Sequence, residues 1–382
     1  MSYVHLEIQS AKQIKYGATP CGDVWDYYRA PGAAYVFLAD GMGSGVKANI
    51  AATMCAARLK ELIKLGYSLQ KSVVNVAETM IQAAKEDLPY AVFSIAAVLT
   101  DGATSVLSFE MPAPLAIIER RAYILERGPI EGAPQGVAQS FCTLAPRDAI
   151  MLVSDGITQA GIGRSMGRGW GERGVASYLN GCLIKSATLE SLPSKALARS
   201  IEICEGCRED DATAILAYCK PGVTVSILTG PPSDPARDAE AVETFDNAEG
   251  IKIICGGTTA SIYSRITGKS ISFATQSRND GSPPASAIKG IDLVTEGVIT
   301  LNQLNNIWNE DREEFEEGNP VTELYDLLNI ADKIVVYAGE SANPANEDMR
   351  FRRMGLRSRE KILPVLLEKF RRAGKLALIQ TI

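Results

Sequence analysis

The sequence contains a single histidine, His5, among 382 residues. A Ser-His-Asp triad or a Cys-His pair would have to use that one side chain, and so would a zinc site with histidine ligands. Ordinary histidine-based catalysis is therefore not expected. If the chain is an enzyme, carboxylates, a metal ion, lysines or backbone groups must carry the reaction.

Long apolar runs are also absent, since none approaches the ~18 residues that a membrane span needs. Residues 1–7 lack the basic and apolar regions of a signal peptide, so we expect a cytoplasmic protein with no membrane partner. The net charge of −6 gives no general attraction to nucleic acid. Eight cysteines in a chain of this length are better explained as reduced, mostly buried thiols than as a disulfide framework.

The length of the chain predicts more than one domain. A chain of 382 residues is too long for one ordinary core, and 46% hydrophobic residues are typical of a globular protein. Lys220-Pro221-Gly222 is a natural boundary, because the spacing of predicted strands and helices changes there. We therefore predict one domain over residues 1–220 and a second over 221–382.

The first domain contains a buried strand that ends in an acidic, glycine-rich turn. An apolar run over residues 36–39 leads into Asp40-Gly41, two further glycines follow within four residues, and helical spacing continues over 46–66. A carboxylate delivered into such a turn suits a hard cation, because glycine backbone can approach closely. The same pattern recurs where residues 149–154 lead into Asp155-Gly156.

Further aspartates at Asp23 and Asp210-Asp211 also adjoin predicted strands. One Asp-Gly is a common turn, and four unrelated turn aspartates are the alternative explanation of the set. Carboxylates gathered without histidine or thiolate suit Mg²⁺ or Mn²⁺, and like charges that close require cations between them. A two-metal site of this kind favours hydrolysis of phosphate esters by a metal-activated water.

Two other stretches of the first domain carry weaker signals. Residues 161–171 are rich in glycine and arginine and are interpreted as a flap, whose Arg164 and Arg168 either meet a phosphorylated substrate or belong to a solvated loop. Cys204 and Cys207 form a lone CxxC, which makes no zinc site without a second pair, so a structural role is favoured over a redox role.

The second domain alternates strands and helices, which predicts a Rossmann-like α/β fold with a mainly parallel sheet and helices on both faces. Ligands of such folds sit at the carboxyl ends of the strands. There, the turn Gly256-Gly257-Thr258-Thr259 opens a predicted helix and is a candidate anion site, with N–H groups and hydroxyls as donors. It is neither a Walker loop nor a GxGxxG motif.

The four aspartate motifs, in this order, resemble those of the SpoIIE-type PP2C-like (PPM) serine/threonine phosphatases. The matching stretches are Gly22-Asp23, Leu38-Ala39-Asp40-Gly41-Met42-Gly43-Ser44-Gly45, Leu152-Val153-Ser154-Asp155-Gly156 and Asp210-Asp211-Ala212-Thr213. The resemblance covers roughly residues 1–220. It implies an α/β/β/α sandwich and a Mn²⁺- or Mg²⁺-dependent removal of phosphate from serine or threonine of a protein.

The resemblance also implies a role for each matched residue. Asp40 would bridge two metal ions, the Gly41 carbonyl would join the second, and Asp23 would act directly or through a metal-bound water. Asp155 and Asp210 would hold the first ion, with Asp210 preferred over Asp211. Catalysis would then rest on Asp40 and Asp155 through a metal-activated water. The predicted helices over 46–66 and 68–88 would correspond to a regulatory switch of this branch.

Two hypotheses of different class follow. The first is an active phosphatase acting on a phosphorylated bacterial signalling protein, with the second domain as a regulatory module that binds a small ligand or a partner protein. The second is a degenerate phosphatase fold that serves as a signalling or binding module, with the second domain as a ligand sensor. The complete aspartate set favours the first, and a homodimer is left open in either case.

Overall fold

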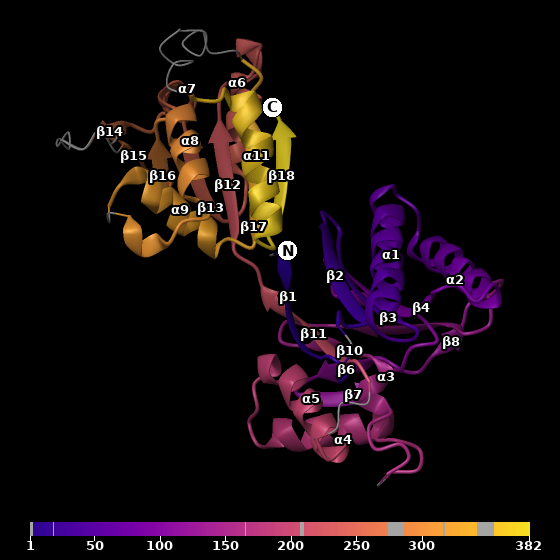
Figure 1. Ribbon diagram of the computed structural model, residues 1–382. Helices are drawn as coiled ribbons and strands as arrows, with labels where there is room; N and C mark the ends of the chain where they lie inside the picture. Colours follow the sequence, from indigo (N-terminus) through magenta and orange to yellow (C-terminus); the bar gives the residue numbers. More distant parts are fainter. Residues whose placement is uncertain are drawn as a thin grey trace. The chain divides into compact units, whose positions relative to one another are not determined.

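The computed structural model describes every residue except 1–2, 18, 165, 207–209, 274–285, 316–317 and 342–354. The chain divides into two compact units, one over Val4–Pro221 and the other over Gly222–Ile382 together with Tyr3 (Figure 1). None of the helices in the described part of the chain is long and apolar enough to cross a lipid bilayer.

Two antiparallel sheets form the centre of the N-terminal unit. The first has the order β2 (Asp23–Ala30), β3 (Ala33–Gly41), β4 (Ala91–Leu99), β5 (Ala103–Phe109), β9 (Val137–Thr143), β8 (Gly128–Pro129). The second has the order β1 (Val4–Gln13), β11 (Ala212–Pro221), β10 (Ala149–Val153), β6 (Leu115–Ile118), β7 (Arg121–Ile124). Inward residues of both sheets, such as Phe37 and Ile215, share one core, so the sheets pack face to face.

Helices cover the outer face of each sheet. The pair α1 (Gly45–Lys64) and α2 (Leu69–Lys85) packs on the first sheet, and the α4 (Gly171–Ile184) and α5 (Leu192–Ile203) pair on the second, with η1 (Leu189–Ser191) between them. The short α3 (Asp155–Thr158) follows β10. Layers of helix, sheet, sheet and helix confirm the predicted α/β/β/α sandwich.

Helix spacing explains the helical layer on the first sheet. The buried residues of α1 recur three or four positions apart, as in Ala48, Ala52, Cys55 and Leu59, so one face of the helix is apolar. The following helix α2 begins at Ser68, whose hydroxyl accepts the backbone N–H of Lys71. These two helices are those expected over 46–66 and 68–88.

The C-terminal unit is built on one seven-stranded sheet. Its order is β14 (Ile271–Phe273), β15 (Ser286–Ile288), β16 (Leu293–Thr295), β13 (Ile251–Cys255), β12 (Thr224–Thr229), β17 (Lys333–Ala338), β18 (Leu376–Thr381). The last five strands in this order pair in parallel, while β14 and β15 form an antiparallel edge. The mainly parallel sheet is as predicted, whereas the β14–β15 edge was not foreseen.

Helices pack on both faces of this sheet (Figure 1). One face carries α8 (Val298–Ile307), α9 (Pro320–Ile330) and α11 (Arg359–Arg372), with η3 (Arg312–Glu314) before α9, and the other carries α6 (Asp238–Asp246) and α7 (Gly257–Thr267), preceded by η2 (Pro235–Arg237). Alternate strand residues enter opposite cores, as Ile253 and Ile254 do, because side chains alternate along a strand.

Successive strands are added on opposite sides of β12. From β12 the chain adds β13 and then β16 on one side, and later adds β17 and β18 on the other. The carboxyl ends of β12 and β17 therefore meet at a topological switch point, the place where doubly wound sheets bind ligands.

The boundary between the units lies between Pro221 and Gly222, and Tyr3 groups with the C-terminal unit rather than with residues 4–221. The carbonyl of Tyr3 accepts the N–H of Gly222 at 2.7 Å, and the ammonium of Lys333 lies 5.6 Å from the centre of the Tyr3 ring. These contacts assign the residue to a unit from which it is distant in sequence.

Candidate metal centre

The predicted aspartates lie at the ends of strands from both sheets of the N-terminal unit. Asp23 on β2 is the register partner of Asp40 on β3, so these two carboxylates are neighbours in the first sheet. In the second sheet, Asp155 follows β10 and Asp210 lies just before β11, and these two strands pair with each other.

Ser154 connects the two sheets at this point. Its hydroxyl donates to Oδ2 of Asp23 at 2.8 Å and accepts the backbone N–H of Thr213 at 2.9 Å. Asp23 is fully buried, and its second oxygen, Oδ1, is a buried atom that has no hydrogen-bond partner among the described residues. A buried carboxylate oxygen left without a donor is costly unless a cation faces it.

Charge crowding at Asp40 supports the same interpretation. Burial raises the pKa of Asp40 well above its ordinary value, and the neighbouring Asp23, Asp155 and Asp210 raise it further. Burial also raises the pKa of Asp23 to about 6, against the lowering effect of the nearby Thr213 hydroxyl and of the hydrogen bond from Ser154. Like charges at this separation disfavour ionisation, and bound divalent cations would reverse that effect.

Asp210 and Asp211 are adjacent in sequence but differ in their surroundings. Asp211 is buried, and its two carboxylate oxygens accept the backbone N–H groups of Gly22 at 2.6 Å and Lys15 at 2.8 Å. Asp210 is exposed, and burial of part of its carboxyl and the charge of Asp155 raise its pKa. Asp211 therefore holds the chain before β2 in place, and Asp210 is the better candidate for a metal ligand.

Gly41 and Gly156 lie where backbone segments touch. A Cβ built on Gly41 would be 1.9 Å from the carbonyl oxygen of Ala48 in α1, and one on Gly156 would be 2.1 Å from that of Asp211. Any side chain at either position would push apart the elements that carry the aspartates. The glycines after these aspartates are thus required by packing, a reason that the sequence did not reveal.

A cavity of about 200 Å³ borders the acidic cluster. Its lining includes Asp210, Gly156 and Gln159, together with Gln13 of β1 and Ser200 of α5. Gln159 donates a hydrogen bond to Oδ2 of Asp155 at 2.9 Å, which orients that carboxylate. Sequence reasoning missed Gln159, because no motif residue marks it.

The remaining candidates of this unit lie in other settings. Arg164 forms an ion pair with Glu205 at 3.5 Å, and Arg168 is exposed. Cys204 is a free thiol, and its predicted companion Cys207 lies outside the described residues.

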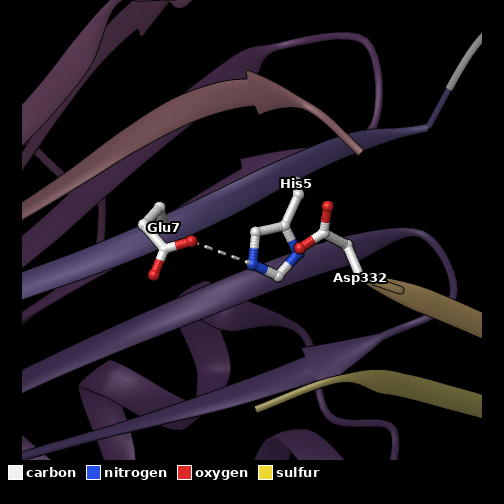
Figure 2. A group of neighbouring side chains, drawn as sticks. All are labelled: His5, Glu7 and Asp332. Atoms are coloured by element: carbon white, nitrogen blue, oxygen red, sulfur yellow. Dashed lines mark ion pairs between the residues drawn. The ribbon is translucent and has the colours of Figure 1, made fainter. Parts of the chain in front are cut away.

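The single histidine lies far along β1 from the acidic cluster. His5 is paired in register with Lys220 and Gln13 with Ala212, so at about 3.3 Å per residue His5 is roughly 26 Å from Gln13 along the strand. His5 is buried, and its Nε2 is 3.8 Å from a carboxylate oxygen of Glu7 (Figure 2). Asp332, also labelled there, belongs to the C-terminal unit. The position of His5 agrees with a chemistry that does not use histidine.

Comparison with known families identifies this sandwich. The model of the family "Stage II sporulation protein E (SpoIIE)" matches residues 30–220, which is half of the chain. The chain belongs to the SpoIIE family. The match begins after Asp23 and ends within one residue of the boundary between the two units.

Solved structures of PP2C-type domains are similar to the chain at low sequence identity. The RsbU and RsbW domains of a Mycobacterium tuberculosis protein share 15% identity, with 64% of this chain and 68% of that chain covered and a TM-score of 0.49. The Bacillus subtilis SpoIIE phosphatase domain with a fragment of its regulatory domain shares 14% identity and has a TM-score of 0.49. The match covers 58% of this chain and 63% of that chain. The B. subtilis SpoIIE phosphatase domain alone shares 13% identity and has a TM-score of 0.46, with 58% of this chain and 95% of that chain covered. No curated protein matches the sequence.

Proposed function

We propose that the chain is a metal-dependent protein phosphatase that hydrolyses phosphoserine or phosphothreonine on a bacterial signalling protein. The observation that carries the proposal is the convergence of Asp23, Asp155 and Asp210 on Asp40, which raises the pKa of Asp40 through both burial and like charge. Membership of the SpoIIE family supports a phosphatase rather than another use of a cation site.

The residues present fit two Mn²⁺ or Mg²⁺ ions. In this proposal Asp40 would be a ligand of both ions and the Gly41 carbonyl a ligand of the second. Asp155 and Asp210 would hold the first ion, and the Oδ1 of Asp23 would be available to the centre. Bound divalent ions neutralise the carboxylates and the phosphoryl oxygens and lower the pKa of a bound water.

Other residues of the chain would hold these ligands in place. Ser154 fixes the rotamer of Asp23 through Oδ2, and Gln159 fixes that of Asp155. Asp211 orders the segment that leads into β2 by binding two of its backbone N–H groups. The cavity beside Asp210 gives space for the phosphorylated side chain of a substrate at the edge of the centre. Outer residues of this kind commonly set metal affinity.

We also propose that the protein is cytoplasmic. Its C-terminal unit would regulate the phosphatase activity by binding a small ligand or a partner protein. Helix α1 begins within a few residues of Asp40, and its residue Ala48 touches Gly41, so a displacement of α1 would reach the metal centre directly. The helices α1 and α2 are therefore the elements through which regulation would act.

Hydrolysis of p-nitrophenyl phosphate with Mn²⁺ tests the proposed activity. We expect Asp40→Asn and Asp155→Asn to lower the rate by more than about 100-fold, since loss of outer-shell partners alone costs 10- to 100-fold. The matched control is Asp26→Asn on the same strand as Asp23, because Asp26 pairs with Lys60 at 2.6 Å instead of joining the cluster.

Calorimetric titration of each variant with Mn²⁺ separates loss of metal from loss of chemistry. Activity that survives both substitutions would contradict the assignment of the centre. Mn²⁺ binding without hydrolysis of p-nitrophenyl phosphate or of any phosphoprotein would instead favour the second hypothesis, a phosphatase fold kept as a signalling module.

A further inference from the structure

The carboxyl edge of the C-terminal sheet contains two helix starts capped by glycine. Gly256 precedes α7 with φ 132° and ψ 125°, and Gly297 precedes α8 with φ 59° and ψ −121°. Both conformations are open mainly to glycine. Among the residues that the structure describes, no side chain caps the first turn of either helix. The N–H groups at both starts therefore lack the partners that Ser, Thr, Asp or Asn usually provides.

These two helix starts lie side by side. The N–H of Gly256 donates to the carbonyl of Thr295 at 2.8 Å, and a Cβ on Gly297 would be 3.1 Å from the Cα of Gly256. The helices have 11 and 10 residues, long enough for each to present a positive dipole end. Adjacent N-termini with small residues between them form a cradle for anionic groups.

A buried hydroxyl in the first turn of α8 also lacks a partner. Thr300 is fully buried, and its Oγ1 forms no hydrogen bond within the described part of the chain. Side chains of a helix lean toward its N-terminus, so that of Thr300 leans toward Gly297. Buried polar atoms are rarely left unsatisfied, and a bound group at this turn would give Oγ1 a partner.

An arginine extends the same edge at the switch point. The N–H of Gly230, just after β12, donates to Oγ1 of Thr259 in the first turn of α7 at 3.0 Å. On its other side Gly230 meets the guanidinium of Arg359 so closely that a Cβ there would lie 1.7 Å from Nη1. Gly230 thus joins the start of α7 to Arg359.

The charge of Arg359 has no carboxylate partner among the described residues. Its Nη2 donates to the backbone carbonyls of Gly339 at 2.7 Å and Ser341 at 2.6 Å. Partial burial lowers the pKa of this guanidinium, and the charge of the neighbouring Glu360 offsets that lowering only in part. A neighbouring anion would offset that cost.

We propose that this edge binds a small molecule carrying a diphosphate, with its phosphate oxygens on the first turns of α7 and α8 and with Arg359 as the counter-charge. Two adjacent helix starts match two linked phosphates better than one. The exposed Glu296, just before Gly297, is an acceptor for hydroxyl groups and favours a sugar beside the diphosphate. A nucleoside diphosphate has both features.

Gly257 provides a substitution that tests the cradle without disturbing the fold. A Cβ at this exposed first residue of α7 would have no atom of the described residues within 4 Å, and its φ is ordinary for any residue. Gly257→Leu therefore adds an apolar side chain at the start of α7 without a clash at its Cβ. We expect its melting temperature to stay at the wild-type value and its ligand affinity to fall at least about tenfold.

The experiment is calorimetric titration of the full chain with pyrophosphate and with ADP at fixed ionic strength, with sulfate as a control for general anion binding. EDTA is present throughout, so that metal at the N-terminal centre contributes nothing and the outcome is independent of phosphatase activity. We expect micromolar to millimolar binding of ADP, weaker binding of pyrophosphate, and about tenfold weaker binding by Arg359→Gln.

The matched control is Arg372→Gln, the same charge change on an exposed side chain at the opposite end of α11. It should bind both probes as the wild type does. The proposal is overturned if neither probe binds, if sulfate binds equally well, or if Gly257→Leu binds as tightly as wild type. Binding of pyrophosphate alone would overturn the sugar part and retain the phosphate cradle.

Discussion

The two units of this chain build candidate sites of opposite charge. In the N-terminal unit, antiparallel strands from two sheets bring side-chain carboxylates together, and the result calls for cations. In the C-terminal unit, parallel strands lead into helices whose N–H groups and one arginine call for an anion. The proposed site of the sandwich is made of side chains at strand ends, whereas the proposed site of the parallel sheet is made of backbone groups at helix starts.

Glycine has a different task at each site. Beside the aspartates it allows two backbone segments to touch, as at Gly156, while in the C-terminal cradle Gly257 leaves open space. A methyl group on Gly156 would clash with the backbone carbonyl of Asp211, whereas one on Gly257 would contact no atom of the described residues. The same residue type therefore supports packing in one unit and access in the other.

Substitution of one glycine in each unit should produce the greatest difference between them. Gly156→Ala should cost about 3 kcal/mol of unfolding free energy, because its Cβ would lie 2.1 Å from a backbone carbonyl that cannot move alone. Gly257→Ala should leave the stability unchanged or slightly raised. Urea denaturation of the full chain measures both, and equal midpoints for the two variants would contradict the distinction.

A smaller effect is expected from the hydroxyl that joins the two sheets. Ser154→Ala removes the hydrogen bond to Asp23 and should weaken Mn²⁺ binding about tenfold, because an unoriented carboxylate is a poorer ligand. Its control is Ser226→Ala, an equally buried serine on β12 that donates to the carbonyl of Glu249. Calorimetric titration with Mn²⁺ compares them, and similar losses in both variants would assign Ser154 to stability alone.

A third prediction concerns aspartate pKa values, which shift in opposite directions in the two units, and here the expected effect is small. The hydroxyl of Tyr263 and then Lys269 lower the pKa of Asp246 in the C-terminal unit, whereas burial raises those of Asp23 and Asp40. A lowered folded pKa gives stability that is present above the unfolded value near 4 and is lost as the pH falls through the folded value. The contribution is small, because Asp246 is partly exposed.

Titration of the Asp246 carboxyl carbon by NMR measures this shift. We expect a midpoint below the ordinary range for aspartate in the wild type and a higher midpoint in Tyr263→Phe, which keeps the ring and removes the donor. An unchanged midpoint in that variant would leave Lys269 as the cause of the shift.

Local sequence patterns predicted much of both units. Apolar runs that end in Asp-Gly located β3 and β10, helical spacing located α1 and α2, and strand-helix alternation predicted the parallel sheet. These elements can be predicted from sequence because each signal depends on residues that are close together in the chain. The antiparallel β14–β15 edge was missed, since its strands have only three residues each.

The candidate site divides along the same line. The candidate aspartates were predicted from sequence motifs. The fold places Asp23 opposite Asp40 in the first sheet, and the second sheet contributes the other aspartates that lie near Asp40. The preference for Asp210 over Asp211 as a candidate ligand depends on Gly22, which is distant in sequence and donates its N–H to Asp211. Gln159 and Arg359 likewise gain their roles only from partners that folding supplies.

The element types of both domains, the acidic set and the glycine-rich turns were predictable from sequence, because periodicity and turn chemistry are local properties of the chain. Three other facts follow only from the fold: Asp211 is bound by backbone N–H groups, Gly156 has no room for a methyl group, and two helix starts lie near Arg359. Those facts depend on distances between residues far apart in sequence, which only the packed sheets and helices set.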